Sequence, residues 1–282
     1  MEKKYDVYGL GNALVDFSVG VSENILKELK LNKGQFNLVN ENQSRKILDK
    51  IKFAQTKINA GGSAANAIAI ISMLGGKTVF CSKVGDDEYG YLYETENNNA
   101  GVESRLLKGK NLTGHCIVLI TPDADRTFAV NLGASLEMLR NDISETDIKL
   151  SKIIHIDGYQ LENLKEVSLH ALNIAKKNNV KISVDLSDPG VVTRNKDVFE
   201  HVLGFTDIIF ANEHEAKAIT GKEPNGAIKE FNSEIMVIKI GEKGSLVKAN
   251  GKIVKIKPVK VTAVDTTGAG DQYVSLHYLA FE

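Results

Sequence analysis

The chain has no tryptophan, only four prolines, and only two cysteines, Cys81 and Cys116. Two cysteines cannot build the disulfide framework on which small secreted domains depend. The first residues, Met1–Tyr5, lead straight into an expected strand without an apolar signal region. Together these features predict a reducing, cytoplasmic location.

An excess of charge of one sign is also missing, because 35 basic residues face 36 acidic ones and the formal net charge is −1. Nucleic-acid-binding proteins and proteins held electrostatically at membranes need a concentrated basic surface. We therefore expect neither nucleic acid nor a membrane as a partner. A composition of 43% hydrophobic and 25% charged residues is that of an ordinary globular protein. The expected partner is a small molecule, neutral or locally anionic.

Strand-like and helix-like segments alternate regularly from Thr56 onward, beginning with a strand at Thr56–Asn59. Such alternation predicts an α/β fold, a doubly wound and mainly parallel sheet flanked by helices. The other strands expected in this sheet are Tyr5–Leu10, Lys77–Ser82, Ile153–Asp157, Lys181–Asp185, Asp207–Phe210 and Ile235–Lys239.

Two β-rich runs, His115–Thr121 and Arg126–Leu132, break the alternation and are joined by the turn Pro122–Asp125. This pattern predicts a hairpin. We expect it to pack with the β-rich residues 17–39 beside the main sheet, where the two could cover a site as a lid. The whole chain, 1–282, is expected to be one domain with lid segments at about 16–40 and 113–133.

The most informative motif is the small-residue turn Val264–Asp271, which precedes an expected helix. A helix start exposes unpaired backbone N–H groups and the positive end of its dipole, and glycines let an anion approach them. The turn is therefore a candidate phosphate site, with Asp271 placed to deprotonate an alcohol. Taken alone, such a turn is more often a glycine-rich turn that ends in a capping aspartate.

A second glycine turn, Ala60–Asn66, follows an expected strand and opens an apolar helix. Gly61 and Gly62 allow a ligand to touch the backbone, and Asn66 offers both a donor and an acceptor. The alternative is that the glycines serve packing alone. Asp16 lies just past the first strand, where α/β proteins bind ligands, and its carboxylate suits a vicinal diol. Alone, Asp16 would more often be a solvated loop residue.

A third motif, Asn212–Glu215, begins a helix directly after an apolar strand. Ordinary helix capping explains an asparagine followed by acids. The functional alternative is that Asn212 and Glu215 organise Mg²⁺ and its waters around nucleotide phosphates. The nearby turn Gly241–Gly244 could border the ribose or a phosphate of the same nucleotide.

Several common site types are excluded by single residues. The run that begins at Gly9 is not a dinucleotide fingerprint, because Leu14 stands in place of its third glycine. A Walker motif ending at Lys77 fails because Ile71 replaces its first glycine and because Lys77 is expected to begin a strand. The six histidines show no metal-like spacing, and there is no hydrolase elbow.

The three motifs together, in this order, resemble the ribokinase-type (PfkB) family of carbohydrate and nucleoside kinases. The resemblance covers nearly the whole chain and implies a ribokinase-like core with a small β-rich lid. It also implies ATP-dependent phosphorylation of a ribonucleoside 5′-hydroxyl, with adenosine as the first expectation and a sugar kinase of the same family as the nearest alternative. The segments most like the adenosine-kinase branch are Gly9–Asp16, Thr113–Cys116, Asp125–Thr127 and Asn131–Ala134.

Within that family, Asp271 matches the catalytic base. The amides of Gly268, Ala269 and Gly270 match the anion hole for the γ-phosphate. Arg126 matches an arginine on the lid hairpin that approaches the phosphates when the lid closes.

On the acceptor side, Asp16 matches the acid that grips the ribose diol. Cys116 and Leu132 fall where the adenosine-kinase branch lines its nucleobase pocket, which favours a flat apolar base over a simple sugar. The residues matched to positions around the sugar are Asn12, Gly61, Gly62, Ser63 and Asn66.

On the donor side, Asn212 and Glu215 match the pair that organises Mg²⁺, with Glu215 acting through water. The resemblance also places the nucleotide near Lys239, Gly241 and Gly244. The loop at Asp265 resembles loops that bind a monovalent cation such as K⁺ in some relatives. A monomer or a homodimer is expected.

The chain departs from the family at its end, because Glu282 follows shortly after Asp271 whereas family members continue well beyond this point. We expect the adenine side of the nucleotide pocket to be incomplete, so a truncated, catalytically defective nucleoside-binding relative is a further alternative. Leu276 stands where a small residue is usual, and overpacking is expected there.

Overall fold

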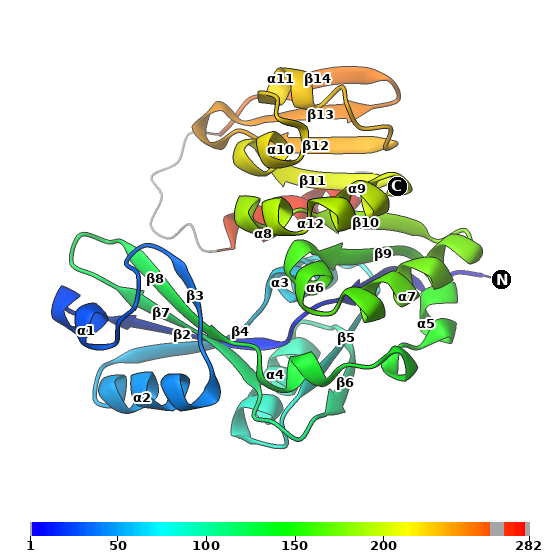
Figure 1. Ribbon diagram of the computed structural model, residues 1–282. Coiled ribbons are helices and arrows are strands. Elements are labelled where there is room, and N and C mark those ends of the chain that lie inside the picture. The colour runs from blue at the N-terminus through cyan, green and yellow to red at the C-terminus, as the bar shows by residue number, and fades with distance from the viewer. Residues whose placement is uncertain (1, 260–267, 280–282) are drawn as a thin grey trace.

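A large, mainly parallel sheet forms the body of the protein, in a computed structural model that describes residues 2–259 and 268–279 (Figure 1). Side chains are described to Ser275. The strand predicted at Lys77–Ser82 is confirmed as β5, which spans Thr78–Val84 and is directly preceded by Lys77. In the described part of the chain, the strand order of this large sheet is β14 (Lys252–Ile256), β13 (Ser245–Ala249), β12 (Ile235–Lys239), β11 (Ile208–Asn212), β10 (Lys181–Asp185), β9 (Ser151–Asp157), β1 (Tyr5–Leu10), β5 (Thr78–Val84) and β6 (Glu103–Lys108).

Within the described residues, seven neighbouring strands of this sheet run parallel: β12, β11, β10, β9, β1, β5 and β6. The strands β13 and β14 are antiparallel additions at one edge. Strands such as β1, β5 and β12 are buried along almost their whole length, as expected where helices cover both faces of a sheet. Parallel strands end at the same edge, so the segments after β1, β9, β10 and β11 come together there. The predicted doubly wound α/β fold is confirmed.

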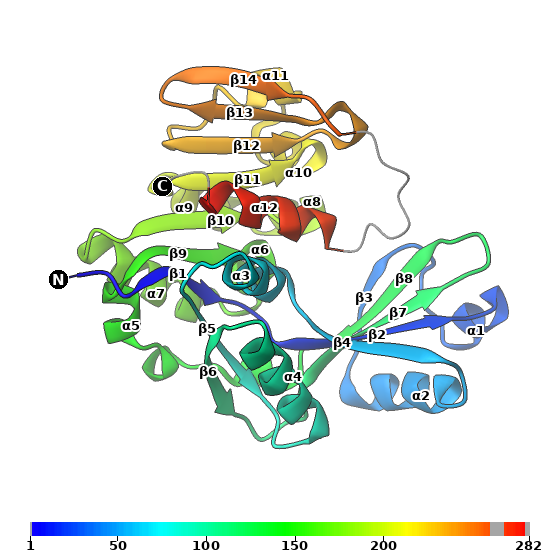
Figure 2. The ribbon, with the colours of Figure 1, turned by 180° about the vertical axis from the view of Figure 1, so that it is seen from behind.

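Helices cover both faces of the large sheet, as the two opposite views show (Figures 1 and 2). One face carries α3 (Ser63–Met73), α4 (Glu88–Asn99) and α12 (Ala269–Leu279). The other face carries α5 (Glu145–Lys149), α6 (Gly158–Asn163), α7 (Lys165–Lys177), α8 (Pro189–Arg194), α9 (Lys196–Leu203), α10 (Glu213–Thr220) and α11 (Pro224–Ala227). Short 3₁₀ turns are η1 (Gly133–Glu137), η2 (Arg140–Asp142) and η3 (Gly241–Lys243).

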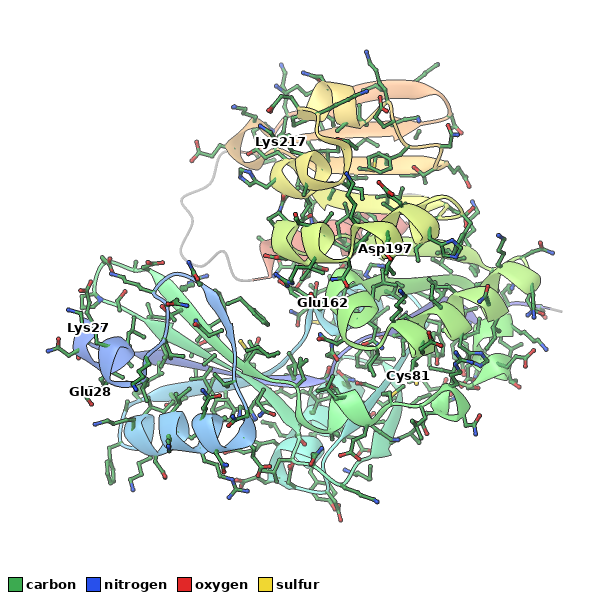
Figure 3. The ribbon with its side chains drawn as sticks, viewed as in Figure 1. Lys27, Glu28, Cys81, Glu162, Asp197 and Lys217 are labelled. Carbon is green, nitrogen blue, oxygen red and sulfur yellow. The ribbon has the colours of Figure 1, made fainter. Side chains whose placement is uncertain are left out.

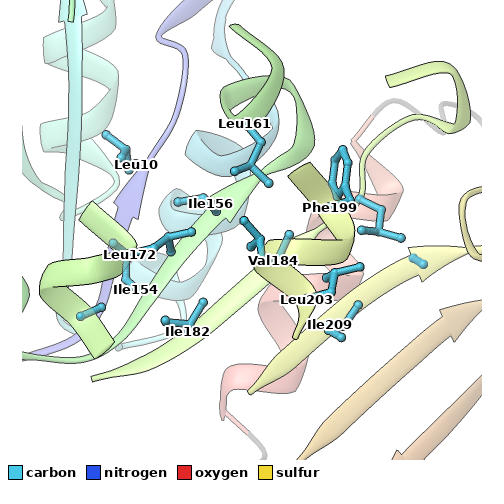
Figure 4. Packing of buried hydrophobic residues seen from close by; sticks show 14 of the residues in the cluster. Leu10, Ile154, Ile156, Leu161, Leu172, Ile182, Val184, Phe199, Leu203 and Ile209 are labelled. Atoms are coloured by element: carbon cyan, nitrogen blue, oxygen red, sulfur yellow. The ribbon is translucent and has the colours of Figure 1, made fainter. Parts of the chain in front are cut away.

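The core between the large sheet and α7–α9 is mainly aliphatic, with the ring of Phe199 packed among the branched side chains (Figure 4). Ile154 and Ile156 of β9 lie beside Ile182 and Val184 of β10, and all four side chains are buried. Burial of such side chains contributes about 1.5–3 kcal/mol each, so this layer holds the strand ends of the large sheet firmly in register.

A small sheet stands beside the large one, with α1 (Glu23–Glu28) and α2 (Glu41–Ile51) packed against it (Figure 1). The predicted hairpin is confirmed, because β7 (Gly114–Ile120) and β8 (Arg126–Asn131) pair in antiparallel fashion. In the described residues the strand order of this sheet is β3 (Phe36–Leu38), β8, β7, β2 (Leu14–Gly20) and β4 (Thr56–Gly61).

The predicted place of Thr56–Asn59 in the parallel sheet is wrong. The strand β4 belongs to the small sheet and runs antiparallel to β2, with Phe17 opposite Ile58. Its sequence is largely polar, and Lys57 and Ile58 are exposed. A strand of a parallel sheet covered on both faces would need a continuous apolar run, which this segment lacks.

Cys81 and Cys116 are both free and buried, and Figure 3 places Cys81 within the body of the large sheet. None of the described helices has the length and apolar character needed to cross a lipid bilayer. The expectations for the Asp265 loop and for the side chain of Leu276 fall outside the described residues.

Candidate active site

A cavity of about 370 Å³ lies where the strand ends of the large sheet meet the small sheet. Its polar wall brings together residues that are far apart in the sequence. Asn12, Asp16, Gly62, Ser63 and Asn66 were predicted to bind substrate, and Gly268 and Asp271 were predicted to act in catalysis. The position is the carboxyl-end edge of the parallel strands, where open α/β sheets bind their ligands.

Asp271 lies in the first turn of α12 and is held by two donors from α3. Ser63 Oγ donates to Asp271 Oδ1 at 2.8 Å, and Asn66 Nδ2 donates to Oδ2 at 2.9 Å. Burial raises the pKa of Asp271 to about 6, with a further contribution from Asp185, although the two hydrogen bonds oppose the shift. At neutral pH this carboxylate is therefore ionised, yet it is far more basic than an exposed aspartate.

Asp16 extends from β2 into the same cavity. Burial raises its pKa to about 7, and the charge of Asp271 adds to the shift. Gly61 does not line the cavity, but a side chain there would collide with the carboxylate of Asp16. Gly62 has φ of +103°, and a Cβ on it would collide with the carbonyl oxygen of Asn12. Both glycines are thus needed by the packing of the site's own residues.

The other end of the cavity is apolar and aromatic. Phe36 of β3 stacks on Tyr159 of α6, with ring centroids 5.7 Å apart and planes at 15°. The pair connects the small sheet to the large one, and both rings line the cavity. The remaining apolar lining residues are Leu14, Cys116, Phe128, Val130 and Leu132, of which Cys116 and Leu132 were predicted from the resemblance.

Several lining residues were missed by sequence reasoning, among them Phe36, Asp157, Tyr159 and Asp188. Asp157 could have been found from the sequence, because it is an aspartate at the end of a predicted strand. Asp16 was noticed for a similar reason, since it lies just past a predicted strand. Nothing in the local sequence of Phe36 or Tyr159 marks them, since their meeting depends on how the two sheets are placed.

A second polar cluster lies beside the start of α12. Lys239 Nζ lies 3.1 Å from Asp185 Oδ2, and both side chains are largely buried. A Cβ on Gly270 would lie 3.4 Å from Lys239 Nζ, so the ammonium group sits next to the segment predicted to bind phosphate. Burial alone would lower the pKa of Lys239, but Asp185 and Glu215 outweigh it and raise that pKa.

Asn212 and Glu215 form the helix cap that was the ordinary explanation of their motif. Asn212 Oδ1 accepts from the backbone N–H groups of His214 and Glu215, both at 2.9 Å. Glu215 accepts in return from the backbone and side-chain nitrogens of Asn212, at 2.7 and 2.5 Å. Burial, together with the charge of Asp185, raises the pKa of Glu215 to about 8.

Asn212 and Glu215 fit a magnesium ion only if water molecules lie between the ion and their side chains. Both oxygens of Glu215 are already engaged by Asn212, and only 2% of Glu215 is exposed. In the described parts of the chain, no three His, Cys, Asp or Glu side chains are placed to hold a metal ion. The donor set suits an ion that is held mainly by nucleotide phosphates and reached through water.

The remaining predicted residues lie outside the cavity. Arg126 begins β8, and its backbone N–H donates to Asp125 Oδ1 at 2.8 Å. Gly241 and Gly244 shape the turn between β12 and β13 with φ of +56° and +91°. Ala269 and Gly270 begin α12 next to the described Gly268, whereas Asp265–Thr267 lie outside the described residues.

Comparison with known proteins adds independent information. Residues 37–279 match the model of the pfkB family carbohydrate kinases. The chain is 31% identical to a 5-dehydro-2-deoxygluconokinase from Clostridium botulinum, over 76% of this chain and 70% of that protein. It is 26% identical to an adenosine kinase from Schizosaccharomyces pombe, over 95% of this chain and 86% of that protein.

Solved structures agree with this match over nearly the full chain. The adenosine kinase from Sinorhizobium meliloti superposes with a TM-score of 0.88 at 28% identity, covering 99% of this chain and 88% of that one. A probable sugar kinase from Rhizobium etli CFN 42 gives a TM-score of 0.89 at 25% identity, covering 99% and 87%. The fold is therefore ribokinase-like, and both nucleoside and sugar kinases are among its relatives.

Proposed function

The chain belongs to the pfkB family of carbohydrate kinases, and on that premise we propose that it transfers the γ-phosphoryl group of ATP to the 5′-hydroxyl of a ribonucleoside, with adenosine as the first acceptor to test. The observation that carries the proposal is the cavity with Asp271 at its polar end and the Phe36–Tyr159 pair at its apolar end. A nucleoside has the same two-ended character, a flat base joined to a polyhydroxylated sugar.

Asp271 acts as the general base in this proposal. Its carboxylate is ionised above a pH of about 6 and is oriented by Ser63 and Asn66, so it accepts the proton of the attacking hydroxyl. A positioned base contributes about 10²–10⁴ in rate. The amides of Gly268, Ala269 and Gly270, at the start of α12, stabilise the charge on the transferred phosphoryl group.

Asp16 binds the ribose diol on the opposite wall. Two carboxylate oxygens can accept from two neighbouring hydroxyls, which replaces the water that a buried carboxylate lacks. Asn12 assists from the same wall: its Oδ1 is buried and has no hydrogen-bond partner among the described residues, so a sugar hydroxyl can supply one.

The nucleobase of the acceptor lies among the apolar lining residues, between the small sheet and α6. The small sheet, which contains the lid segments at about 16–40 and 113–133 as well as β4, serves as a lid, and the chain works as a single kinase domain. Closure excludes water and favours transfer to the acceptor over hydrolysis. Arg126 on the hairpin approaches the phosphates in the closed form.

ATP lies beyond Asp271, against Lys239 and the turn from Gly241 to Gly244. Glu215 with Asn212 would hold Mg²⁺ through water, and the ion would supply charge neutralisation at the phosphates. A monovalent cation such as K⁺ at the Asp265 loop, a cytoplasmic location, and a monomeric or homodimeric state complete the proposal.

A sugar kinase is the second candidate, and the 31% identity to a 5-dehydro-2-deoxygluconokinase supports it. ADP release from Mg-ATP, measured with adenosine, inosine, guanosine, ribose, fructose and 5-dehydro-2-deoxygluconate, separates the two. Turnover with adenosine that Asp271→Ala abolishes supports a nucleoside kinase, whereas turnover with sugars alone overturns that assignment. Adenosine binding without turnover by folded protein would instead support a nucleoside-binding relative.

A further inference from the structure

Helix α3 carries both donors to Asp271, yet it lacks a capping side chain of its own. Its N-cap residue is Gly62, which makes no side-chain hydrogen bond. The first N–H groups of a helix have no partner within the helix, and a glycine at the N-cap cannot supply one. The start of α3 must therefore be held from elsewhere if Ser63 and Asn66 are to keep their positions.

Asp157, the last residue of β9, supplies the missing acceptor. Its Oδ2 accepts from the backbone N–H of Ala64 in α3 at 3.0 Å. Its Oδ1 accepts from the backbone N–H of Gln160 at 2.8 Å, and this bond caps α6. Gly11 permits the arrangement, because a side chain there would press against Ala64. One carboxylate thus joins the first turns of two helices that lie far apart in the sequence.

These two helices carry the two ends of the cavity. Helix α3 places the donors that orient Asp271, and α6 places Tyr159, whose ring forms the aromatic wall with Phe36. Asp157 is only 2% exposed. Burial raises its pKa to about 6, although two backbone donors oppose the shift. A buried carboxylate is costly to keep, and its position between the two helices accounts for its presence.

We propose that Asp157 is a positioning residue that sets the catalytic end of the cavity relative to its aromatic end. This inference rests on the proposed kinase function, since it assigns the alignment of Asp271 against a bound acceptor to Asp157. It acts through the backbone of α3 and α6 and needs no contact with substrate.

Asp87 offers a matched control. It is the N-cap residue of α4, where Oδ1 accepts from Gly90 N at 2.8 Å, and its Oδ2 accepts from the backbone N–H of Thr113 at 2.7 Å. Asp87 therefore joins two segments in the same manner as Asp157, but it does not line the cavity. Asp157→Asn and Asp157→Ser both keep a cap for α6, and both lose the ionised acceptor for Ala64. Asp87→Asn is the corresponding control substitution.

The experiment combines amide hydrogen exchange across Ser63–Asn66 in the unliganded protein with steady-state kinetics. We expect Asp157→Asn and Asp157→Ser to speed exchange in this segment by about tenfold or more. A shift of about 1 Å in a reacting group can cost about 10²-fold, so kcat should fall about 10- to 100-fold while KM for ATP stays within about twofold. Asp87→Asn should lower Tm without either effect.

Unchanged exchange at Ser63–Asn66 in the Asp157 variants would overturn the proposal, even if activity were lost, because it would indicate a direct contact with the acceptor. An equal loss of kcat in Asp87→Asn would also overturn it. So would failure of both Asp157 variants to fold while Asp87→Asn folds, since Asp157 would then determine the fold itself. Exchange does not depend on turnover, so a wild-type protein without kinase activity would refute the proposed function and still leave this inference tested.

Discussion

Asn66 Nδ2 lies 2.9 Å from Asp271 Oδ2 and joins the first turn of α3 to the first turn of α12. This hydrogen bond favours the ionised form of Asp271 and opposes the effect of burial on its pKa. The same contact therefore both orients the proposed base and sets the pH at which it works.

The acid limb of the pH profile follows from this contact. We expect kcat/KM for the acceptor to fall below a pH of about 6, because Asp271 must be ionised to accept a proton. Asn66→Ala removes a donor to the ionised form, so the pKa of Asp271 rises and the limb moves to higher pH. Ser63→Ala should move it in the same direction by a smaller amount. A limb that stays in place in both variants would show that another group controls it.

Asp16 should limit stability at neutral pH. Its folded-state pKa of about 7 lies above its ordinary value of 3.8, so its contribution to stability is complete below pH 3.8 and is lost as the pH rises through 7. Asp16→Asn removes the cost of a buried charge and should stabilise the protein at pH 8 by up to about 4 kcal/mol. The gain should shrink at pH 5, while acceptor binding is lost at both values.

Thermal unfolding of Asp16→Asn at pH 5 and pH 8 checks this prediction. Asp197→Asn is a suitable control, because Asp197 is an exposed carboxylate on α9 (Figure 3) and does not line the cavity. If Asp16→Asn lowered Tm at pH 8, the ionised carboxylate would be stabilising the folded protein and the prediction would fail.

Lys239 should have separable roles in stability and in turnover. Lys239→Met leaves Asp185 and Glu215 buried without their cation, and breaking a buried pair costs about 3–5 kcal/mol. Adding Asp185→Asn should recover much of this loss. The double variant should still show a raised KM for ATP and a lowered kcat, because the ammonium group beside Gly270 is missing. Full recovery of both kinetic constants would make Lys239 purely structural.

Phe36 should discriminate nucleosides from free sugars. An aromatic pair contributes about 0.5–1.5 kcal/mol beyond burial, so Phe36→Ala should raise KM for adenosine about two- to tenfold and leave KM for ribose nearly unchanged. Leu38 lies on the same strand and does not line this cavity, so Leu38→Ala is the control. If Phe36→Ala changed KM for adenosine and for ribose equally, the nucleobase would have to bind elsewhere.

The sequence predicted the body of the fold well, because apolar strands alternate with helices and few other folds accept that pattern. It failed where the pattern was weak. The strand β6, Glu103–Lys108, is too polar to be recognised from its periodicity, and the helix α8 begins with a Pro-Gly pair that is typical of a turn and is followed closely by α9. The strand β4 was assigned to the wrong sheet because strand pairing is not a local property.

The polar end of the cavity could also be anticipated. Asp16 follows the parallel strand β1, and Ser63, Asn66 and Asp271 lie in the first turns of helices; both kinds of position commonly bind ligands in α/β proteins. The aromatic end could not, because Phe36 and Tyr159 meet only through the placement of the small sheet against α6. The double role of Asp157 was hidden for a related reason, since its second partner, Ala64, is remote in sequence.

The Phe36–Tyr159 stack also bears on how fast a ligand can enter. Beyond the burial of the two rings, the stack contributes about 0.5–1.5 kcal/mol. A ligand that must part the two rings to enter would be slowed about two- to tenfold by this stacking contribution, and the acceptor's own ring, once stacked on Tyr159, would take over the role of holding the sheets together.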